Sequence, residues 1–570
     1  MKSLIPVAGA IILAILFLDC SEDEGDSAVG SSESLSTRPR TNVLLITVDT
    51  LRADHLPMYG ATSNMSVPAF QFLTDNGFLF EQAVTPAPLT LPAHASILTG
   101  KLPSSHGARD NGLFSLNASA RTLAEILKAY DYRTGAFVSS FVLDKRYGLG
   151  QGFDVYDDKT TDPQSSVVFA ERRGQETAQK AIFWIFNEDK DQPFFCWIHL
   201  FDPHKPYDPP EPFKTQYNDS PYDGEIAYTD QIIGEIYSVL SREGVLDNTL
   251  SIVTADHGEG LGDHGELTHG LALYDTTMRV PLFFHGPGIP ARGRSNLQAR
   301  LTDIAPTVLD WLDVKSAAAF DGRSLRPAIE GKPMEEAPAI LETTTGYFLY
   351  DAPPIFGLRL AGYKLIRGWE DELYDLSADP SETSNKMTSR LDTGRRLKDR
   401  LDSVLAAFPP LPQATIPAVE EIEKLKALGY LGGGQEGADF SPSALHKLID
   451  DMVLAQNLLN VGRRKKAREL LDQVISTYPR NVEALRLIGD DELAFGDPAR
   501  ALEIYDLAKA NSRIVNPVVD LNRALCLLAL GRHDDARSAV LDVLSVFPNH
   551  TDALRLGKDL GIQIGNTRAR

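Results

Sequence analysis

The sequence predicts an α/β domain, with a mainly parallel sheet covered by helices on both faces, followed by an all-α helical domain. Residues 42–48, 194–200 and 250–254 are near-continuous apolar runs rich in β-branched and aromatic residues. Such runs are typical of strands buried on both faces of a parallel sheet. Helical patterns such as 122–130 and 226–240 lie between them, and alternating strands and helices indicate the α/β class. The chain becomes helical in pattern throughout its final part.

The composition is that of a globular chain with several domains. The chain has 570 residues, too many for one hydrophobic core, and 43% of them are hydrophobic and 24% charged. The 78 acidic and 56 basic residues give a net charge of −22. This balance argues against a nucleic-acid partner, because binding to phosphates needs a basic surface. The acidic excess is also what a cation-binding chain would carry. Three cysteines are too few for a disulfide framework or a zinc finger.

The N-terminus has the pattern of a targeting segment. Lys2 precedes an apolar run over 4–18, which is short for a membrane span but suits a signal peptide. Cys20 follows this run at the place of a lipidated cysteine, although Asp19 is not the small residue expected before it. We therefore predict a signal peptide over 1–20, lipidation of Cys20 and a flexible tether over 21–40. The protein would then be exported to the periplasm or outer surface as a membrane-anchored lipoprotein. An ordinary signal peptide or a marginal anchor remains open.

Potential metal ligands follow all three predicted strands. Asp49 ends the first strand, Asp202 and His204 follow the second, and Asp256 and His257 follow the third. The carboxyl ends of parallel strands meet at one edge of a sheet, where ligands bind. Carboxylates together with imidazoles suit a zinc- or manganese-like ion, whereas oxygen ligands alone would suit calcium or magnesium. A single aspartate after a strand is usually a turn or cap residue, but three strand ends of this kind favour a metal site. His199 alternates into the second strand and is assigned to the core.

Thr90 is a candidate nucleophile. It lies just before Pro92, in a segment that begins as a loop and ends at Gly100, and proline favours the first turn of a helix. A hydroxyl at a helix start lies beside free backbone amides and the positive end of the helix dipole, where a phosphate or sulfate group binds. A metal ion beside the same oxygen would make it a nucleophile at neutral pH. The alternative is a simple helix-capping threonine.

The chain resembles the sulfatase branch of the alkaline phosphatase superfamily over residues 41–410. The sulfatase signature reads Cys/Ser-x-Pro-x-Arg-x-x-x-Leu-Thr-Gly, and this chain has Thr90-Leu-Pro-Ala-His94-Ala-Ser-Ile-Leu-Thr-Gly100. Segments 103–107, 362–366 and 372–376 also resemble that family, the last two its small C-terminal sheet. The resemblance implies that Asp49, Asp256 and His257 bind metal and that His204 contacts the substrate oxyanion. His269 falls where sulfatases usually carry a lysine.

Departures from the signature point to phosphorus chemistry. Threonine is not a known precursor of the formylglycine that sulfatases use, His94 replaces the signature arginine, and Thr50 replaces a second aspartate. These changes fit the nucleotide pyrophosphatase/phosphodiesterase-like branch, which attacks phosphorus with a threonine and uses two zinc ions. That resemblance implies a catalytic set and two groups of metal ligands. The catalytic set is Thr90, His94, His204 and His269; one metal would take Asp49, Thr90, Asp256 and His257, and the other Asp202, His204 and His269. A single ion, or Ca²⁺, Mg²⁺ or Mn²⁺, remains open.

The final part of the chain, over 441–570, carries an internal repeat after a glycine-rich linker over 411–440. Gly462, Gly496 and Gly531 each begin a similar segment, at spacings of 34 and 35 residues. This period resembles tetratricopeptide repeats. Stacked helix pairs of that kind present a concave surface for a protein or peptide partner. A helical cap on the enzyme is the alternative.

These observations predict an exported, metal-dependent hydrolase that cleaves a phosphate or sulfate ester through Thr90. Its substrate would be an anionic ester, and the repeats would bind a partner. Phosphate esters are somewhat favoured over sulfate esters. Two alternatives remain: a phosphoethanolamine-type transferase, and a non-catalytic sulfatase-like scaffold.

Overall fold

The computed structural model describes residues 41–62, 65–160, 171–187, 192–350, 352–411, 414–415, 441–512, 514–546 and 550–562. The predicted signal peptide, Cys20, the tether and most of the linker lie outside these described residues. Phe547 and Pro548, which follow the third repeat, also lie outside them. Among the described residues, no helix is both long enough and apolar enough to cross a bilayer.

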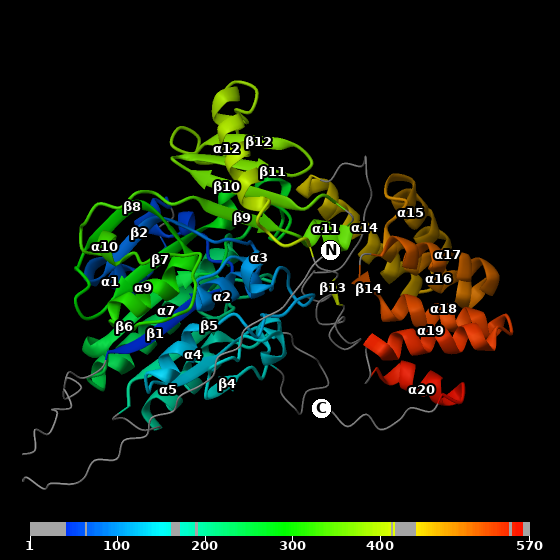
Figure 1. Ribbon diagram of the computed structural model, residues 1–570, viewed down its shortest axis with the longest axis horizontal. Coiled ribbons are helices and arrows are strands. Elements are labelled where there is room, and N and C mark those ends of the chain that lie inside the picture. Colours follow the sequence, from blue (N-terminus) through cyan, green and yellow to red (C-terminus); the bar gives the residue numbers. More distant parts are fainter. Residues whose placement is uncertain are drawn as a thin grey trace, which may run out of the picture. The chain divides into compact units, whose positions relative to one another are not determined.

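The main sheet has eight strands in the order β4-β3-β5-β1-β6-β7-β2-β8 (Figure 1). The strands are β1 Asn42–Val48, β2 Phe78–Val84, β3 Arg133–Phe137, β4 Val155–Asp157, β5 Phe194–Leu200, β6 Thr249–Ala255, β7 Arg279–His285 and β8 Gly293–Arg300. Every neighbouring pair is parallel except those that involve β7, which runs antiparallel to β6 and β2. The prediction of a mainly parallel sheet is therefore confirmed.

Central strand β1 lies between the other two predicted strands. It pairs in parallel with β5 on one side and with β6 on the other. All residues of β5 and β6 are buried, as are all of β1 except Asn42. Apolar side chains on both faces of these strands explain why their sequences are continuously hydrophobic rather than alternating. The carboxyl ends of all three strands consequently lie side by side at one edge of the sheet.

Helices cover both faces of the sheet. The principal ones are α1 Pro68–Asn76, α2 Thr90–Thr99, α4 Leu123–Ala129, α5 Gly174–Asn187, α7 Pro221–Arg242 and α9 Ile304–Trp311. Helix α7 contacts α1 and α5, whereas α2 contacts α4 and α9. Shorter helices connect these elements: α3 Pro103–His106, α6 Phe213–Gln216, α8 Asp275–Met278, α10 Arg326–Ile329 and α11 Thr345–Tyr350.

A small antiparallel sheet follows the main sheet in sequence, as the resemblance implied. Its order is β12-β11-β10-β9, with β9 Ala339–Thr343, β10 Ile355–Leu360, β11 Tyr363–Arg367 and β12 Asp371–Asp375. Helix α12, Leu391–Leu405, packs Leu397 and Leu401 on this sheet. A buried two-bond ion pair between Arg109 and Glu342 joins β9 to the loop after α3, at 2.8 and 3.0 Å.

The final part of the chain is helical, as predicted. Its helices are α14 Pro442–Asn460, α15 Arg464–Thr477, α16 Val482–Phe495, α17 Pro498–Asn511, α18 Pro517–Ala529, α19 His533–Val546 and α20 Thr551–Asp559. Two short strands, β13 Ala414–Thr415 and β14 Ile514–Val515, pair in parallel. Gly462 and Gly531 lie in turns between paired helices with φ of 73° and 76°, a conformation that favours glycine. The second repeat lacks the proline that stands at 479 and 548 in the other two. Its next helix still begins with a side-chain cap, from Asn516 to Val518, as the helices after the other repeats do with Asn481 and His550.

Candidate active site and metal centre

Three predicted site residues meet at the carboxyl ends of β1 and β6. Asp49 follows β1, and Asp256 and His257 follow β6. The Nε2 atom of His257 lies 3.6 Å from Oδ1 of Asp49 and 3.4 Å from Oδ2 of Asp256. All three side chains are fully buried. The parallel pairing of β1 with β6 brings together residues that are more than 200 positions apart in the chain.

The site requires close backbone packing. Thr50, directly after Asp49, adopts a left-handed φ of 54°, which is costly for a β-branched residue. Its N–H donates to Oδ1 of Asp256 at 3.3 Å, and its carbonyl accepts from the Tyr222 hydroxyl at 2.6 Å. A Cβ atom on Gly258 would lie 2.1 Å from the carbonyl oxygen of Thr276. Glycine is therefore required after His257.

Thr90 is placed against this group. It is the first residue of α2, and its Oγ1 lies 3.3 Å from Nε2 of His257. The threonine is fully buried. Its own side chain does not cap the helix; instead the Leu91 N–H donates to Oδ1 of Asn111 at 2.8 Å. The hydroxyl is thus directed to the histidine and the carboxylates.

Asp49 and Asp256 are buried carboxylates that form no ion pair with any arginine or lysine in the described part of the chain. Among the described residues, neither oxygen of Asp49 nor Oδ2 of Asp256 has a hydrogen-bond partner. Burial raises the pKa of both carboxyl groups well above the ordinary value, and the charge of Asp49 raises that of Asp256 further. Two such groups side by side need protons or a cation. The chemistry of this donor set, two carboxylates and an imidazole with a hydroxyl nearby, fits a divalent metal ion.

Three histidines direct the same ring nitrogen to the site. Nδ1 of His257 donates to the Gly258 carbonyl at 2.9 Å, Nδ1 of His204 to the Lys205 carbonyl at 2.7 Å, and Nδ1 of His269 to the Pro88 carbonyl at 3.1 Å. A carbonyl oxygen only accepts, so the ring proton is on Nδ1 and each Nε2 presents a lone pair. The Nε2 atoms of His204 and His269 lie 3.2 Å apart. This tautomer is the one that metal-binding histidines adopt when a carbonyl orients them.

Burial also keeps these histidines neutral. It lowers the pKa of His257 to about 3 and that of His204 to about 4. The pKa of His269 is likewise lowered by burial, and further by His257 and His204. Neutral imidazoles at neutral pH are electron-pair donors. They therefore suit metal binding better than proton donation.

Asp202 is not brought together with His204 and His269. Its Oδ2 accepts the Gly174 N–H at the start of α5, at 2.9 Å, and its Oδ1 lies 3.8 Å from the Arg173 guanidinium. The described residues within metal-binding reach of one another form two groups, Asp49-Asp256-His257 and His94-His199-Asp256. The metal role of Asp202 stays a prediction, and in this structure its carboxylate instead binds the N-terminus of a helix.

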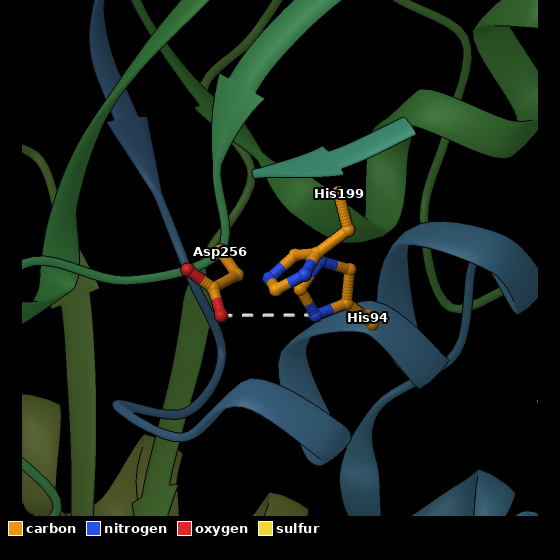
Figure 2. A group of neighbouring side chains, drawn as sticks. All are labelled: His94, His199 and Asp256. Carbon is orange, nitrogen blue, oxygen red and sulfur yellow. Dashed lines mark ion pairs between the residues drawn. The ribbon is translucent and has the colours of Figure 1, made fainter. Parts of the chain in front are cut away.

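His94 contacts the backbone of Thr90 and not its hydroxyl. Its Nδ1 lies 2.7 Å from the Thr90 carbonyl, and its Nε2 lies 2.8 Å from Oγ1 of Thr47. Nδ1 is also 3.7 Å from Oδ2 of Asp256, the ion pair drawn in Figure 2. His94 thus joins the first turn of α2 to strand β1 and holds Thr90 in position.

Sequence reasoning missed two residues of this site. Asn111 binds the residue next to Thr90 through Oδ1, while its buried Nδ2 has no partner among the described residues. His199, assigned to the core, has Nε2 3.3 Å from Oδ2 of Asp49. No spacing or motif connects either residue to the site, because both contacts depend on how distant segments pack. His199 is indeed buried, as a core residue would be.

The comparisons with known proteins agree with this fold and with a candidate metal site. Residues 41–314 match the family model "Sulfatase", and residues 262–406 match "N-sulphoglucosamine sulphohydrolase, C-terminal". The chain therefore carries a sulfatase-family domain, that of sulfuric and phosphoric ester hydrolases. Residues 452–513 match a tetratricopeptide repeat model, which confirms the repeat prediction.

Similar proteins include an arylsulfatase from Clostridium perfringens, 24% identical over 460 residues that cover 64% of this chain and 92% of the relative. Two solved structures share the fold. One is of a protein in complex with its substrate D-glucosamine-2-N,6-O-disulfate, with 21% identity, a TM-score of 0.56, and coverage of 64% of this chain and 98% of that one. The other is a phosphonate monoester hydrolase from Agrobacterium radiobacter, with 22% identity, a TM-score of 0.55, and coverage of 64% and 95%.

The raised pKa values of Asp49 and Asp256 predict that the metal-free protein loses stability as pH rises. The folded chain holds protons that the unfolded chain has released, so the unfolding free energy falls through this range. Buried histidines act in the opposite sense only below about pH 6.5. The melting temperature of chelator-treated protein should therefore fall as the pH rises above about 7, by roughly 2–4 °C for each kcal/mol lost. Metal-loaded protein should show a smaller change.

The double variant Asp49→Asn/Asp256→Asn is the control. It cannot ionise at these positions, so its metal-free melting temperature should fall less over the same range than that of the wild-type protein. The remaining fall comes from other buried carboxyl groups such as Glu259, whose pKa burial raises to about 8. Equal pH dependence of the melting temperature in the variant and the wild-type protein would contradict the raised pKa values of Asp49 and Asp256.

Proposed function

We propose that the protein is a metal-dependent hydrolase of phosphate or sulfate esters in which Thr90 is the nucleophile, with phosphate esters favoured. The observation that carries this proposal is the position of the Thr90 hydroxyl, which is fully buried and 3.3 Å from Nε2 of His257. It lies beside two carboxylates that pair with no arginine or lysine among the residues that the structure describes. The sulfatase-family domain supports ester hydrolysis in general, and the threonine supports phosphorus as its target.

In the proposed reaction, Oγ1 of Thr90 attacks the phosphorus atom and gives up its proton to water. A bond from Oγ1 to phosphorus forms while the bond to the leaving oxygen breaks, and that oxygen departs with the bonding electrons and takes up a proton from water. Water then attacks the phosphothreonine, which releases phosphate or a monoester and restores the hydroxyl. A divalent ion held by Asp49, Asp256 and His257 would supply positive charge beside the hydroxyl and the ester oxygens.

Neighbouring side chains orient Thr90 and the bound ester. His94 holds the Thr90 carbonyl, and Asn111 holds the next N–H through its Oδ1. The Nδ2 of Asn111 is a buried donor that has no partner in the described part of the chain, which suits an oxygen of the bound ester. Because Nε2 of His204 and of His269 carries a lone pair, these histidines fit a second cation better than a direct contact with an anionic oxygen. Zinc suits such imidazole ligands, and two ions are proposed on this ground.

Thr90→Ala should abolish turnover, since the attacking oxygen is lost, while metal binding and folding persist. We expect a fall of about 10³-fold or more in kcat/KM with aryl phosphodiesters, phosphomonoesters or sulfate esters, measured on metal-loaded protein without residues 1–20. Thr90→Ser keeps a hydroxyl and is the matched control, with substantial activity. A ³²P-labelled ester should label the wild-type protein and not Thr90→Ala.

The alternatives differ in outcome. Sulfate turnover that survives Thr90→Ala would overturn the mechanism. Transfer of the phosphoryl group to a lipid acceptor in preference to water would indicate the transferase. No metal binding and no turnover by the wild-type protein would indicate the non-catalytic scaffold.

We propose that the protein is exported and anchored to a membrane through Cys20. The support is the apolar segment over 4–18 with a cysteine directly after it. Cys20→Ser should be found in the soluble periplasmic or medium fraction, whereas the wild-type protein should be found with membranes and incorporate labelled palmitate. Equal membrane association of both proteins would argue for an anchor made by the apolar segment itself.

We also propose that the repeats bind a peptide segment of a partner protein. Side chains from α14, α16, α18 and α20 line a groove of about 780 Å³. The groove contains an apolar patch of Leu521, Leu525 and Leu556 between polar groups that include Asn522 and Arg555. Repeats of this class present such a surface to partners, and the repeat match over 452–513 supports this role.

Leu525→Asp should weaken binding of a peptide selected against the full-length protein from a displayed library, by about 10-fold or more. A charge would replace apolar contact area in the groove. Leu525 is 42% exposed, and the control Leu541→Asp changes a leucine that is 46% exposed but does not line the groove. Equal effects of the two substitutions in calorimetric titrations would contradict a binding role for the groove.

A further inference from the structure

Four consecutive polar residues, 342–345, lie at the end of strand β9 in the small sheet, and all four are buried. None of them is more than 4% exposed. A buried hydroxyl or carboxylate is costly unless it forms a hydrogen bond. Each of these four side chains meets this need through a loop of the candidate active site, and so the small sheet reaches three such loops from one short segment.

Glu342 binds two of the loops. Strand β9 is the last in the order of the small sheet, and the N–H of Glu342 donates to the Pro86 carbonyl at 2.9 Å. The carboxylate of the same residue accepts both bonds of the Arg109 ion pair. Pro86 lies four residues before Thr90, and Arg109 lies two residues before Asn111. Both loops therefore lead to the first turn of α2, where the proposed nucleophile lies.

Thr344 and Thr345 bind the loop that carries Arg109. The Thr344 hydroxyl donates to the Arg109 carbonyl at 3.0 Å, and the Thr345 hydroxyl donates to Oδ2 of Asp110 at 2.8 Å. Asp110 is fully buried. The next residue, Asn111, directs its Oδ1 to the first turn of α2. Both residues before Asn111 are thus held by the small sheet.

Thr343 binds the third loop. Its hydroxyl donates to the carbonyl of Gly270, which directly follows His269. The ring of His269 is held from its other side by the Pro88 carbonyl, and its Nε2 lies 3.2 Å from Nε2 of His204. The place of the Gly270 carbonyl therefore affects where the lone pair of His269 lies.

We propose that segment 342–345 is a positioning segment, which holds the loops of Thr90, Asn111 and His269 in the one arrangement that the reaction needs. Through Thr343 it places His269, a proposed ligand of the second ion. Through its last two residues it places Asn111, the proposed donor to the bound ester. The small sheet is thereby part of the site and not only a support for the fold. The inference rests on the proposed function for the roles of His269 and Asn111.

Two threonine-to-valine substitutions test the segment, because valine has nearly the shape of threonine and lacks its hydroxyl. Chelator-treated, full-length protein is titrated with ZnCl₂, and turnover of an aryl phosphodiester is measured on the zinc-loaded protein. Thr343→Val should weaken binding of the second zinc ion by about 10-fold or more, as the loss of other groups that orient metal ligands does. Thr345→Val should keep both zinc dissociation constants within about threefold and lower kcat by about 10-fold or more, with a smaller change in KM.

Matched variants separate positioning from lost stability. Thr343→Ser and Thr345→Ser keep the hydroxyl and should restore the wild-type values. Thr307→Val removes another buried hydroxyl of the same domain, which in helix α9 bonds the Asp303 carbonyl and the Leu325 N–H. It should change neither zinc affinity nor kcat by more than about threefold. If a valine variant does not fold, as judged by circular dichroism, the alanine variant at that position takes its place.

Amide hydrogen exchange of the metal-free protein distinguishes this inference from the proposed function. Thr343→Val should speed exchange in the loop 266–271 and Thr345→Val in the loop 109–113, each without effect on the other loop. Unchanged exchange in both variants would overturn the inference, as would equal losses of zinc affinity and turnover in these variants and in Thr307→Val. A wild-type protein that binds no zinc and hydrolyses no ester would overturn the proposed function, and the exchange rates would then decide whether the segment holds the loops.

Discussion

The burial of two carboxylates side by side is the constraint on which the rest of this structure depends. Asp49 and Asp256 end neighbouring parallel strands, and no described arginine or lysine forms an ion pair with either of them. Two negative charges in such surroundings are unstable without protons or a cation. The sheet therefore brings together two carboxylates, Asp49 and Asp256, that need a cation between them. The surrounding residues provide further ligands and hold these groups in position.

The surrounding histidines meet this demand without adding charge. His257, His204 and His269 each donate Nδ1–H to a backbone carbonyl and direct a lone pair inward. Burial keeps the pKa of His257 and His204 far below neutral pH. His94 has the complementary role, since it holds the Thr90 carbonyl. One residue type thus provides both the inner donors and a group that orients Thr90.

The class of the fold followed from periodicity, because burial on both faces leaves a continuous apolar run in a strand. The repeats followed from glycines 34 and 35 residues apart, two of which occupy left-handed turns. Sequence could not show how the second repeat enters its next helix without the expected proline. In the structure Asn516 caps that helix, as Asn481 and His550 cap the helices after the other two repeats, so the side-chain cap and not the proline is common to all three junctions.

By itself the sequence determined which residues end the buried strands, and so it predicted that Asp49, Asp256 and His257 would lie together. Only the tertiary structure decided the partners of the remaining groups. Asp202, although it follows a strand, accepts the first N–H of α5. Asn111 reaches the residue after Thr90, and His199 reaches Asp49 across 150 positions of sequence. The physical reason is that a strand's end fixes where a residue lies, whereas side-chain direction and hydrogen-bond partners depend on packing between segments distant in the chain.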